Sequence, residues 1–244
     1  MIFPIGDDNT DRTIFPSMNY LIILVNILVF VFLQGFGSNI KFTYTYSTVP
    51  AEIITGKDIV TGDREMEDTE TGERVEVPGL QKTPINVYLT IFTSMFMHGG
   101  IAHIFGNMIF LWVFGDNIEN KLGHFRYLIF YLVCGVISSL SQVFATVAFN
   151  GNPYIPTLGA SGAISGVLGG YMLLYPRRRV RVVLFYILTI VPAIVAIGLW
   201  FVFQLIAGLG GLGSPESGGV AYAAHVGGFI AGFILIKIFA LGRP

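Results

Sequence analysis

The stretch Gly159-Ala160-Ser161-Gly162-Ala163-Ile164-Ser165-Gly166 begins an apolar run that continues to Tyr175. A helix over residues 161–175 is about 22 Å long, whereas the hydrocarbon core of a bilayer is roughly 30 Å thick. Arginines at positions 177, 178, 179 and 181 fix the far end of the run at a membrane interface, so the end that carries Ser161 must stop inside the membrane. A helix end is tolerated there only where it is buried in protein or lines a watery cavity. The sequence therefore predicts an enclosed polar site at Ser161.

Composition indicates the environment of this helix. Hydrophobic residues make up 53% of the 244 residues and charged residues only 12%, compared with roughly 25% charged residues in a soluble domain. We therefore predict a polytopic, all-α membrane protein with one membrane domain of about six spans. The net charge of −1 leaves no basic excess for binding nucleic acid. The single cysteine, Cys134, excludes an intrachain disulfide and a thiolate metal cluster.

The apolar runs divide the chain into the expected spans. We place them at residues 18–36, 101–118, 125–149, 161–175, 182–207 and 220–239, within a membrane domain that covers residues 18–240. The fifth contains Pro192, which should kink the helix and let it move as part of a lateral gate. Residues 85–97 are apolar but interrupted by Asn, Thr and Ser, which favours a segment that lies at the interface or re-enters the membrane.

Polar segments flank the spans. Residues 1–17 are expected to be a cytoplasmic lead-in that is not a removable signal peptide, because acidic side chains precede the first span. Residues 37–84 form a long external loop, and residues 241–244 form a tail. Within the loop, a charged insertion over 57–78 repeats a Thr-Gly-acid-Arg pattern that suggests two short strands or turns.

Basic residues set the predicted orientation. With the amino terminus in the cytoplasm, most of the 14 Lys and Arg residues fall inside, as the positive-inside rule requires. They are Arg12, Lys121, Arg126, Arg177, Arg178, Arg179, Arg181, Lys237 and Arg243. We therefore expect a multi-pass protein of the cell membrane with both termini cytoplasmic. Ser161 and His225 then both lie toward the outer side.

Small residues predict that the fourth and sixth spans pack closely. The fourth carries the stripes Ser161/Ser165/Gly169 and Gly162/Gly166/Gly170, and the sixth carries Ala224/Gly228/Gly232. Small residues at every fourth position let two helix backbones approach, which would aim Ser161 at His225. The pair would then be a nucleophile and its base. The alternative is that both side chains are only packing and hydrogen-bonding residues.

A second polar pair lies on the second span. His103 and Asn107 are four residues apart, so they share one helix face near the outer end. With backbone N–H groups at the start of the fourth span they could stabilise an oxyanion, or they could simply join helices by hydrogen bonds. The acidic residues of this span, Asp116 and Glu119, lie about 20 Å or more from His103 along the axis. We therefore infer a Ser/His dyad and not a triad.

Four motifs follow one another over roughly residues 85–240. They are His98-x4-His103-x3-Asn107, Gly115-x3-Glu119-x3-Gly123, Gly159-Ala160-Ser161-Gly162 and Ala224-His225-Val226-Gly227-Gly228. In order and spacing they resemble the rhomboid family of intramembrane serine proteases. The resemblance implies a six-helix bundle that cuts transmembrane protein substrates in the lipid bilayer, near its outer side, without a cofactor or a metal.

The resemblance also implies a role for individual residues. Ser161 would be the nucleophile, His225 the general base, and His103 and Asn107 the oxyanion stabilisers. Gly159, Gly162 and Gly228 would support this site. Glu119 would anchor polar contacts near the inner end of the second span, and residues 85–97 would form a partly embedded loop.

Two features depart from the family pattern. Some members stack an aromatic residue on the histidine, but that position is Ser165 here, so Tyr171 or Tyr222 would have to hold the imidazole. The Trp-Arg pair that some members carry in the embedded loop is absent from this sequence. Neither departure concerns the dyad itself.

Two other functions stay open. A metal-dependent intramembrane protease would use His98, His103 and His225, although the chain has no His-Glu-x-x-His helix. A non-catalytic rhomboid relative would bind membrane clients without cutting them, although such relatives usually lose the serine or the histidine. A transporter is disfavoured because we find no internal inverted repeat.

Overall fold

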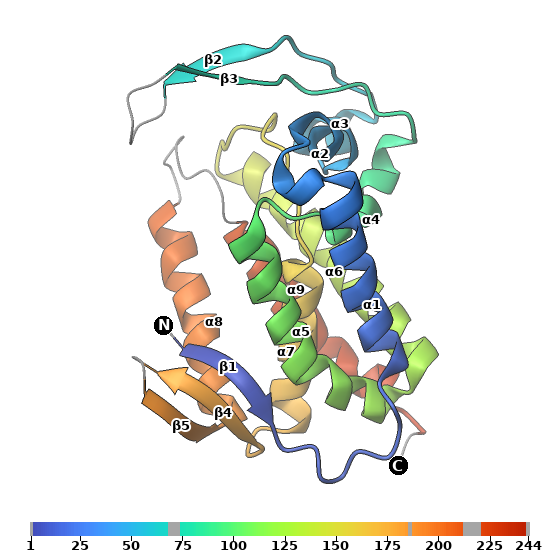
Figure 1. Cartoon of the computed structure of the whole chain (residues 1–244), viewed down its shortest axis with the longest axis vertical. Coiled ribbons are helices and arrows are strands. Elements are labelled where there is room, and N and C mark those ends of the chain that lie inside the picture. The colour runs from blue at the N-terminus through green and yellow to red at the C-terminus, as the bar shows by residue number, and fades with distance from the viewer. Residues whose placement is uncertain (1, 68–73, 185–186, 212–220, 243–244) are drawn as a thin grey trace.

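The computed structural model describes the chain except for residues 1, 68–73, 185–186, 212–220 and 243–244 (Figure 1). Three helices in the described part are long and apolar enough to cross a membrane: α5 (Ile101–Leu122), α6 (His124–Ala148) and α9 (Tyr222–Phe239). Shorter apolar helices include α1 (Ser17–Leu28) with its π-helical extension (Val29–Leu33), α7 (Ser161–Leu174) and α8 (Ala193–Gly211). The chain is therefore a predominantly helical, multi-pass membrane protein, whereas the count of about six spans stays a prediction.

Parts of five predicted segments lie outside the described residues. They are residue 1 of the lead-in, residues 68–73 of the charged insertion, residues 185–186 of the fifth span, residue 220 at the start of the sixth span, and residues 243–244 of the tail.

Short elements connect α1 to α5. They are a 3-10 turn (Gly35–Gly37), α2 (Ile40–Tyr46), α3 (Pro50–Thr55), β2 (Arg64–Glu67), β3 (Arg74–Val77), a 3-10 turn (Val87–Leu89), α4 (Thr90–Thr93) and a last 3-10 turn (Ser94–Phe96). β2 pairs antiparallel with β3, which confirms the short strands predicted for the charged insertion. The pair lies at one end of the molecule, and a second sheet lies at the opposite end (Figure 1).

Helices α7 and α9 form the centre of the bundle, as the small-residue stripes predict. A Cβ atom added to Gly232 would overlap the carbonyl oxygen of Gly166, and one added to Gly169 would overlap the carbonyl oxygen of Phe229. The two backbones therefore touch where the glycines face each other. α7 is buried from Gly162 to Tyr171, and α5, α6, α8 and α9 all contact it.

The prediction of a helix from residue 182 is wrong, and so is the prediction that the described fold is all-α. Residues 179–184 form β4 (Arg179–Leu184) and residues 187–192 form β5 (Ile187–Pro192), and these two strands pair antiparallel. β4 also pairs with the amino-terminal strand β1 (Ile2–Asp7), which gives a sheet of order β1-β4-β5. The reason is visible in β4, where exposed arginines alternate with the buried Val180 and Val182. Such alternation, with a run of β-branched residues after it, is typical of a half-buried strand.

Pro192 consequently has another role than the predicted kink. It is the last residue of β5, and α8 begins at the next residue. Proline has no backbone N–H to donate and is tolerated on an edge strand and beside the first turn of a helix. The segment predicted as a lead-in, residues 1–17, contains the strand β1.

Charged and polar side chains join the ends of α1, α5 and α7 that lie nearest to the β1-β4-β5 sheet. The Glu119 carboxylate accepts hydrogen bonds from the backbone N–H groups of Met18 (2.9 Å) and Asn19 (2.6 Å), which satisfies unpaired donors in the first turn of α1. Asp7, at the end of β1, accepts hydrogen bonds from the Asn117 amide (2.7 Å) and the Tyr171 hydroxyl. These contacts bind the amino-terminal segment to both α5 and α7.

The stability of this junction should depend on pH. Asp7 is 7% exposed, and its Oδ1 has no hydrogen-bond partner among the described residues. Burial raises the pKa of Asp7 to about 7; Asp116 adds to the rise, while the Tyr171 hydroxyl and the Arg178 guanidinium oppose it. The folded protein thus holds this proton more tightly than the unfolded chain. The free energy of unfolding should therefore fall as the pH rises from about 4 to about 7.

Thermal unfolding in detergent across this pH range checks the expectation. Asp7→Asn replaces the carboxyl group by an amide, which has an acceptor oxygen but does not titrate. The variant should therefore lose this part of the pH dependence of the free energy of unfolding. Asp8→Asn, at a neighbouring and accessible site, is the matched control and should keep it. Equal pH dependence in the wild type and in Asp7→Asn would contradict the assignment.

A second prediction concerns the glycine contact. Gly232→Ala should lower the free energy of unfolding by about 1–3 kcal/mol, because the added methyl group forces the two backbones apart. Gly198→Ala on α8 is the matched control, since no atom lies within 4 Å of its added Cβ. Both variants can be compared by their melting temperatures. A Gly232→Ala protein as stable as the control would show that the α7–α9 contact adapts to a side chain.

Candidate active site

Ser161 and His225 meet where α7 and α9 begin. Ser161 is the first residue of α7, and His225 lies in the first turn of α9. Ser161 Oγ lies 2.7 Å from His225 Nε2, which is hydrogen-bonding distance. An imidazole nitrogen at this distance can take the hydroxyl proton when the oxygen attacks a substrate.

The glycine contacts below this pair set its geometry. A Cβ atom on Gly228 would overlap the Gly162 carbonyl oxygen, and one on Gly162 would overlap the Ser138 hydroxyl. Ser138, on α6, donates a hydrogen bond to the Ala224 carbonyl oxygen (2.8 Å), beside the histidine. α6 therefore holds the start of α9 against α7. Ser165 bonds within its own helix, since its hydroxyl donates to the Ser161 carbonyl oxygen (2.6 Å).

Gly159 shapes the turn that leads to Ser161. Its φ of +126° is unfavourable for any residue with a side chain. A Cβ there would lie 3.1 Å from the His103 ring and 3.5 Å from Ser161 Oγ, so His103 and Ser161 both face the space beside this glycine. The Gly159 N–H donates to the Ser94 carbonyl oxygen (2.9 Å), which ties the turn to the segment before α5. No side chain caps the start of α7, which leaves backbone N–H donors there for a ligand.

The polar pair of α5 faces the same region. His103 Nδ1 accepts a hydrogen bond from the Gly99 N–H (3.3 Å). Asn107, one turn further along, is 8% exposed, and its Nδ2 has no hydrogen-bond partner among the described residues. A buried amide donor without an acceptor is costly. It is therefore available to a negatively charged oxygen of a bound substrate.

His98 is held away from the dyad. The side chain of Gln34 accepts a hydrogen bond from the His98 N–H (2.9 Å) and donates one to its carbonyl oxygen (2.9 Å). The His98 ring packs edge-on against His103, with centroids 5.2 Å apart. Among the described residues, no group of three or more His, Cys, Asp or Glu side chains could hold a metal ion.

Gln204 of α8 also contacts the dyad, although no sequence motif predicted it. Its Oε1 lies 2.6 Å from His225 Nδ1, on the opposite side of the ring from Ser161. Trp200, one turn earlier, lies 6.1 Å from the His225 ring between centroids, and Tyr222 lies 6.3 Å away, edge-on. Tyr171, the other proposed support, is instead bonded to Asp7. In the sequence, Gln204 is a polar residue four positions after Trp200 within an apolar run, which marks it as unusual. Only the packing of α8 beside α9 shows that its partner is His225.

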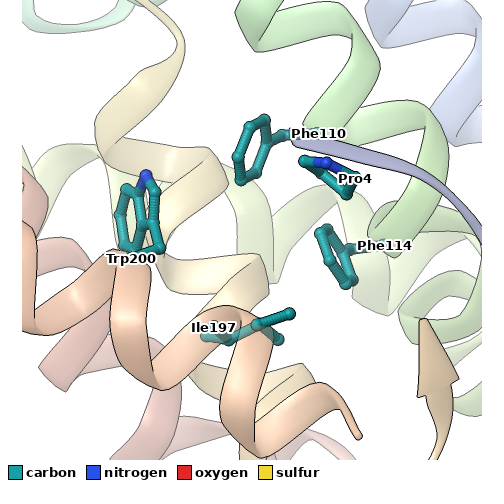
Figure 2. A pocket seen from close by; sticks show the side chains of 6 residues that line it. Pro4, Phe110, Phe114, Ile197 and Trp200 are labelled. Carbon is teal, nitrogen blue, oxygen red and sulfur yellow. The ribbon is translucent and has the colours of Figure 1, made fainter. Parts of the chain in front are cut away.

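A small apolar pocket adjoins Trp200 (Figure 2). It lies between α5 and α8 and is closed by the amino-terminal strand. Its lining residues are Pro4, Phe110, Phe114, Ala196, Ile197 and Trp200. Glu119 belongs neither to this pocket nor to the dyad, since it lies at the α1 junction.

Comparison with known proteins gives a consistent result. The family model described as Rhomboid domain matches residues 86–241. Rhomboid protein 1, mitochondrial, of Saccharomyces cerevisiae is 31% identical over 160 residues, which are 64% of this chain and 43% of that protein. Rhomboid protease GluP of Bacillus subtilis is 32% identical over 154 residues, 63% of this chain and 26% of that protein.

A third relative covers less of the chain. Presenilin-associated rhomboid-like protein, mitochondrial, of Homo sapiens is 34% identical over 117 residues, 44% of this chain and 30% of that protein. The chain thus spans less than half of the length of these curated relatives.

Proposed function

Because the chain belongs to the rhomboid family, we propose that it is an intramembrane serine endopeptidase with Ser161 as nucleophile and His225 as general base. The observation that carries the proposal is the 2.7 Å separation of Ser161 Oγ and His225 Nε2. The name of one relative, Rhomboid protease GluP, also supports it.

The proposed reaction needs only groups of the chain and water. His225 Nε2 takes the Ser161 proton as Oγ bonds to the carbonyl carbon of the scissile peptide. The imidazolium then gives this proton to the leaving amine, which leaves an acyl-enzyme ester. A water molecule, deprotonated by the same nitrogen, cleaves the ester and restores Ser161. The oxyanion of each tetrahedral intermediate would be stabilised by His103, the Asn107 amide and the Ser161 backbone N–H.

The proposed substrates are transmembrane proteins. The nucleophile lies at the start of a helix that is too short to span the bilayer, so it acts inside the membrane, near the outer side. A helix keeps its carbonyl groups hydrogen-bonded, and a client must therefore unwind locally before attack. The proposal includes six spans formed by α1, α5, α6, α7, α8 and α9 within residues 18–240. The membrane would be the cell membrane. Residues 37–84 would lie outside the cell, and both termini would lie in the cytoplasm.

Labelling with a fluorophosphonate tests the proposed nucleophile. The purified wild type should be labelled and should cut a transmembrane client, whereas Ser161→Ala should do neither. His225→Ala should lose turnover because no other base contacts the hydroxyl in the described residues. Both variants should melt near the wild-type temperature, since neither side chain forms the glycine contact. Ser141→Ala, a helix-bonded serine of α6, is the matched control and should stay active.

Other results would favour the alternatives. Clients bound but never cut by an unlabelled wild type would indicate the non-catalytic role. Cleavage by Ser161→Ala that a chelator stops would indicate a metal-dependent reaction.

The oxyanion role of Asn107 is tested by kinetics. Losing one oxyanion donor commonly reduces turnover by about 10²–10³-fold with little effect on substrate binding. Asn107→Ala should therefore lower kcat by a factor of this order and leave KM nearly constant. An unchanged kcat with a lowered melting temperature would instead make Asn107 a structural residue.

A further inference from the structure

We propose that Gln204 is a positioning residue for His225, and that its place on α8 makes assembly of the dyad depend on the position of that helix. The inference rests on the proposed dyad. It adds an orienting group that the sequence motifs do not contain, and it links this group to α8, whose described contacts beside the site include the aromatic side chains of Trp200 and Phe201.

The first step concerns the tautomer of His225. Gln204 is 5% exposed, and its Oε1 can only accept a hydrogen bond, so Nδ1 must carry a proton. A neutral imidazole with its proton on Nδ1 has a free lone pair on Nε2. That lone pair faces Ser161 Oγ at 2.7 Å. Gln204 therefore selects the tautomer that can accept the serine proton.

The second step concerns charge. A serine hydrolase with a triad orients its histidine with a carboxylate. The described structure offers none here, since Asp116 and Glu119 are engaged at the opposite end of α5. An ionised carboxylate is expensive to bury among apolar helices, whereas a neutral amide costs much less. Gln204 can thus fix the ring without bringing a charge into the membrane.

The third step concerns the helix that carries Gln204. α8 has far fewer contacts with the bundle than α7 and α9 have with each other. Aromatic rings hold it in place: Phe201 stacks on Phe229 with centroids 4.1 Å apart, and Trp200 contacts both Phe229 and Phe110. On its other side lies the small pocket toward α5 (Figure 2). A sideways movement of α8 would therefore remove Gln204 from His225 without disturbing the α7–α9 contact.

The consequence is an order of events. A client that displaces α8 as it enters would separate Gln204 from the imidazole, which could then adopt the unproductive tautomer. Chemistry would resume only when α8 packs against α9 again. Gln204 should therefore affect turnover and not the affinity for the client.

Kinetics of full-length variants in lipid vesicles tests the positioning role. Gln204→Met keeps most of the side-chain volume but has no amide, so it should lower kcat about 10- to 100-fold with KM unchanged, the range expected for one lost buried hydrogen bond. Gln204→Glu keeps an acceptor oxygen for Nδ1, so at higher pH, where the carboxyl group is ionised, its kcat should exceed that of Gln204→Met. Because a carboxylate stabilises the imidazolium, the acidic limb of the kcat profile should move toward higher pH. Phe203→Ala, on the exposed face of α8, is the matched control.

A cross-linking experiment tests whether assembly of the dyad depends on the position of α8. Cysteines at positions 201 and 229, in a Cys134→Ala background, would allow a short thiol cross-link that holds α8 against α9. The cross-linked protein should react with a small fluorophosphonate at least as fast as the same protein without the link, and should cut transmembrane clients more slowly. A cross-link that slows the fluorophosphonate reaction would overturn the link to α8.

Failure of this inference can be told from failure of the proposed function. A wild type that is labelled and cuts its client, together with a Gln204→Met variant of equal kcat, would overturn only the positioning role. An unmoved acidic limb in Gln204→Glu would do the same. A wild type that is neither labelled nor active would overturn both proposals.

Discussion

The contact between the backbones of α7 and α9 is the constraint on which the site depends. A Cβ atom at Gly169 of α7, or at Gly228 or Gly232 of α9, would overlap the backbone of the other helix. A Cβ atom at Gly162 or Gly166 would overlap side chains of α6, which packs on the other face of α7. Ser161 and His225 both lie in the first turns of their helices, so this contact brings the two side chains together on helical backbone and not on loops. Lipid supplies no hydrophobic driving force between helices, so close packing of small residues is an effective way to fix their relative position.

Polar groups are distributed along the bundle according to their charge. At the end with the β1-β4-β5 sheet, charged and ionisable groups bind neighbouring polar groups: Glu119 caps α1, Arg178 donates to the Asp8 carbonyl oxygen, and Asp7 accepts from the Asn117 amide. Around Ser161 and His225, the described hydrogen bonds instead join imidazole, carboxamide and hydroxyl groups. This division follows from the cost of placing a charge in a low-dielectric medium, which is lowest where water and headgroups are near.

The sheet gives α8 a different kind of anchor from the other long helices. β5 leads directly into α8, β5 pairs with β4, and β4 pairs with β1, whose Pro4 lines the pocket beside Trp200 (Figures 1 and 2). The end of α8 near Ala193 is thus tied by backbone hydrogen bonds. In its other half, the contacts that the structure describes beside the site are made by the side chains of Trp200 and Gln204.

The sequence alone determined the membrane class and the close α7–α9 pair, and it predicted that Ser161 and His225 lie together. Those features depend on local quantities: the length of an apolar run, the spacing of glycines, and the position of a serine or histidine within one helix. The tertiary structure decided what depends on partners distant in sequence. Residues 182–184 and 187–192 are apolar enough for a helix, but β4 pairs with both β1 and β5, so they form strands of one sheet. Gln204 is an unremarked polar residue until α8 packs beside α9. Tyr171 lies in the right helix to support His225, yet its depth gives it Asp7 as a partner, because a side chain can bond only to groups at its own level in the membrane.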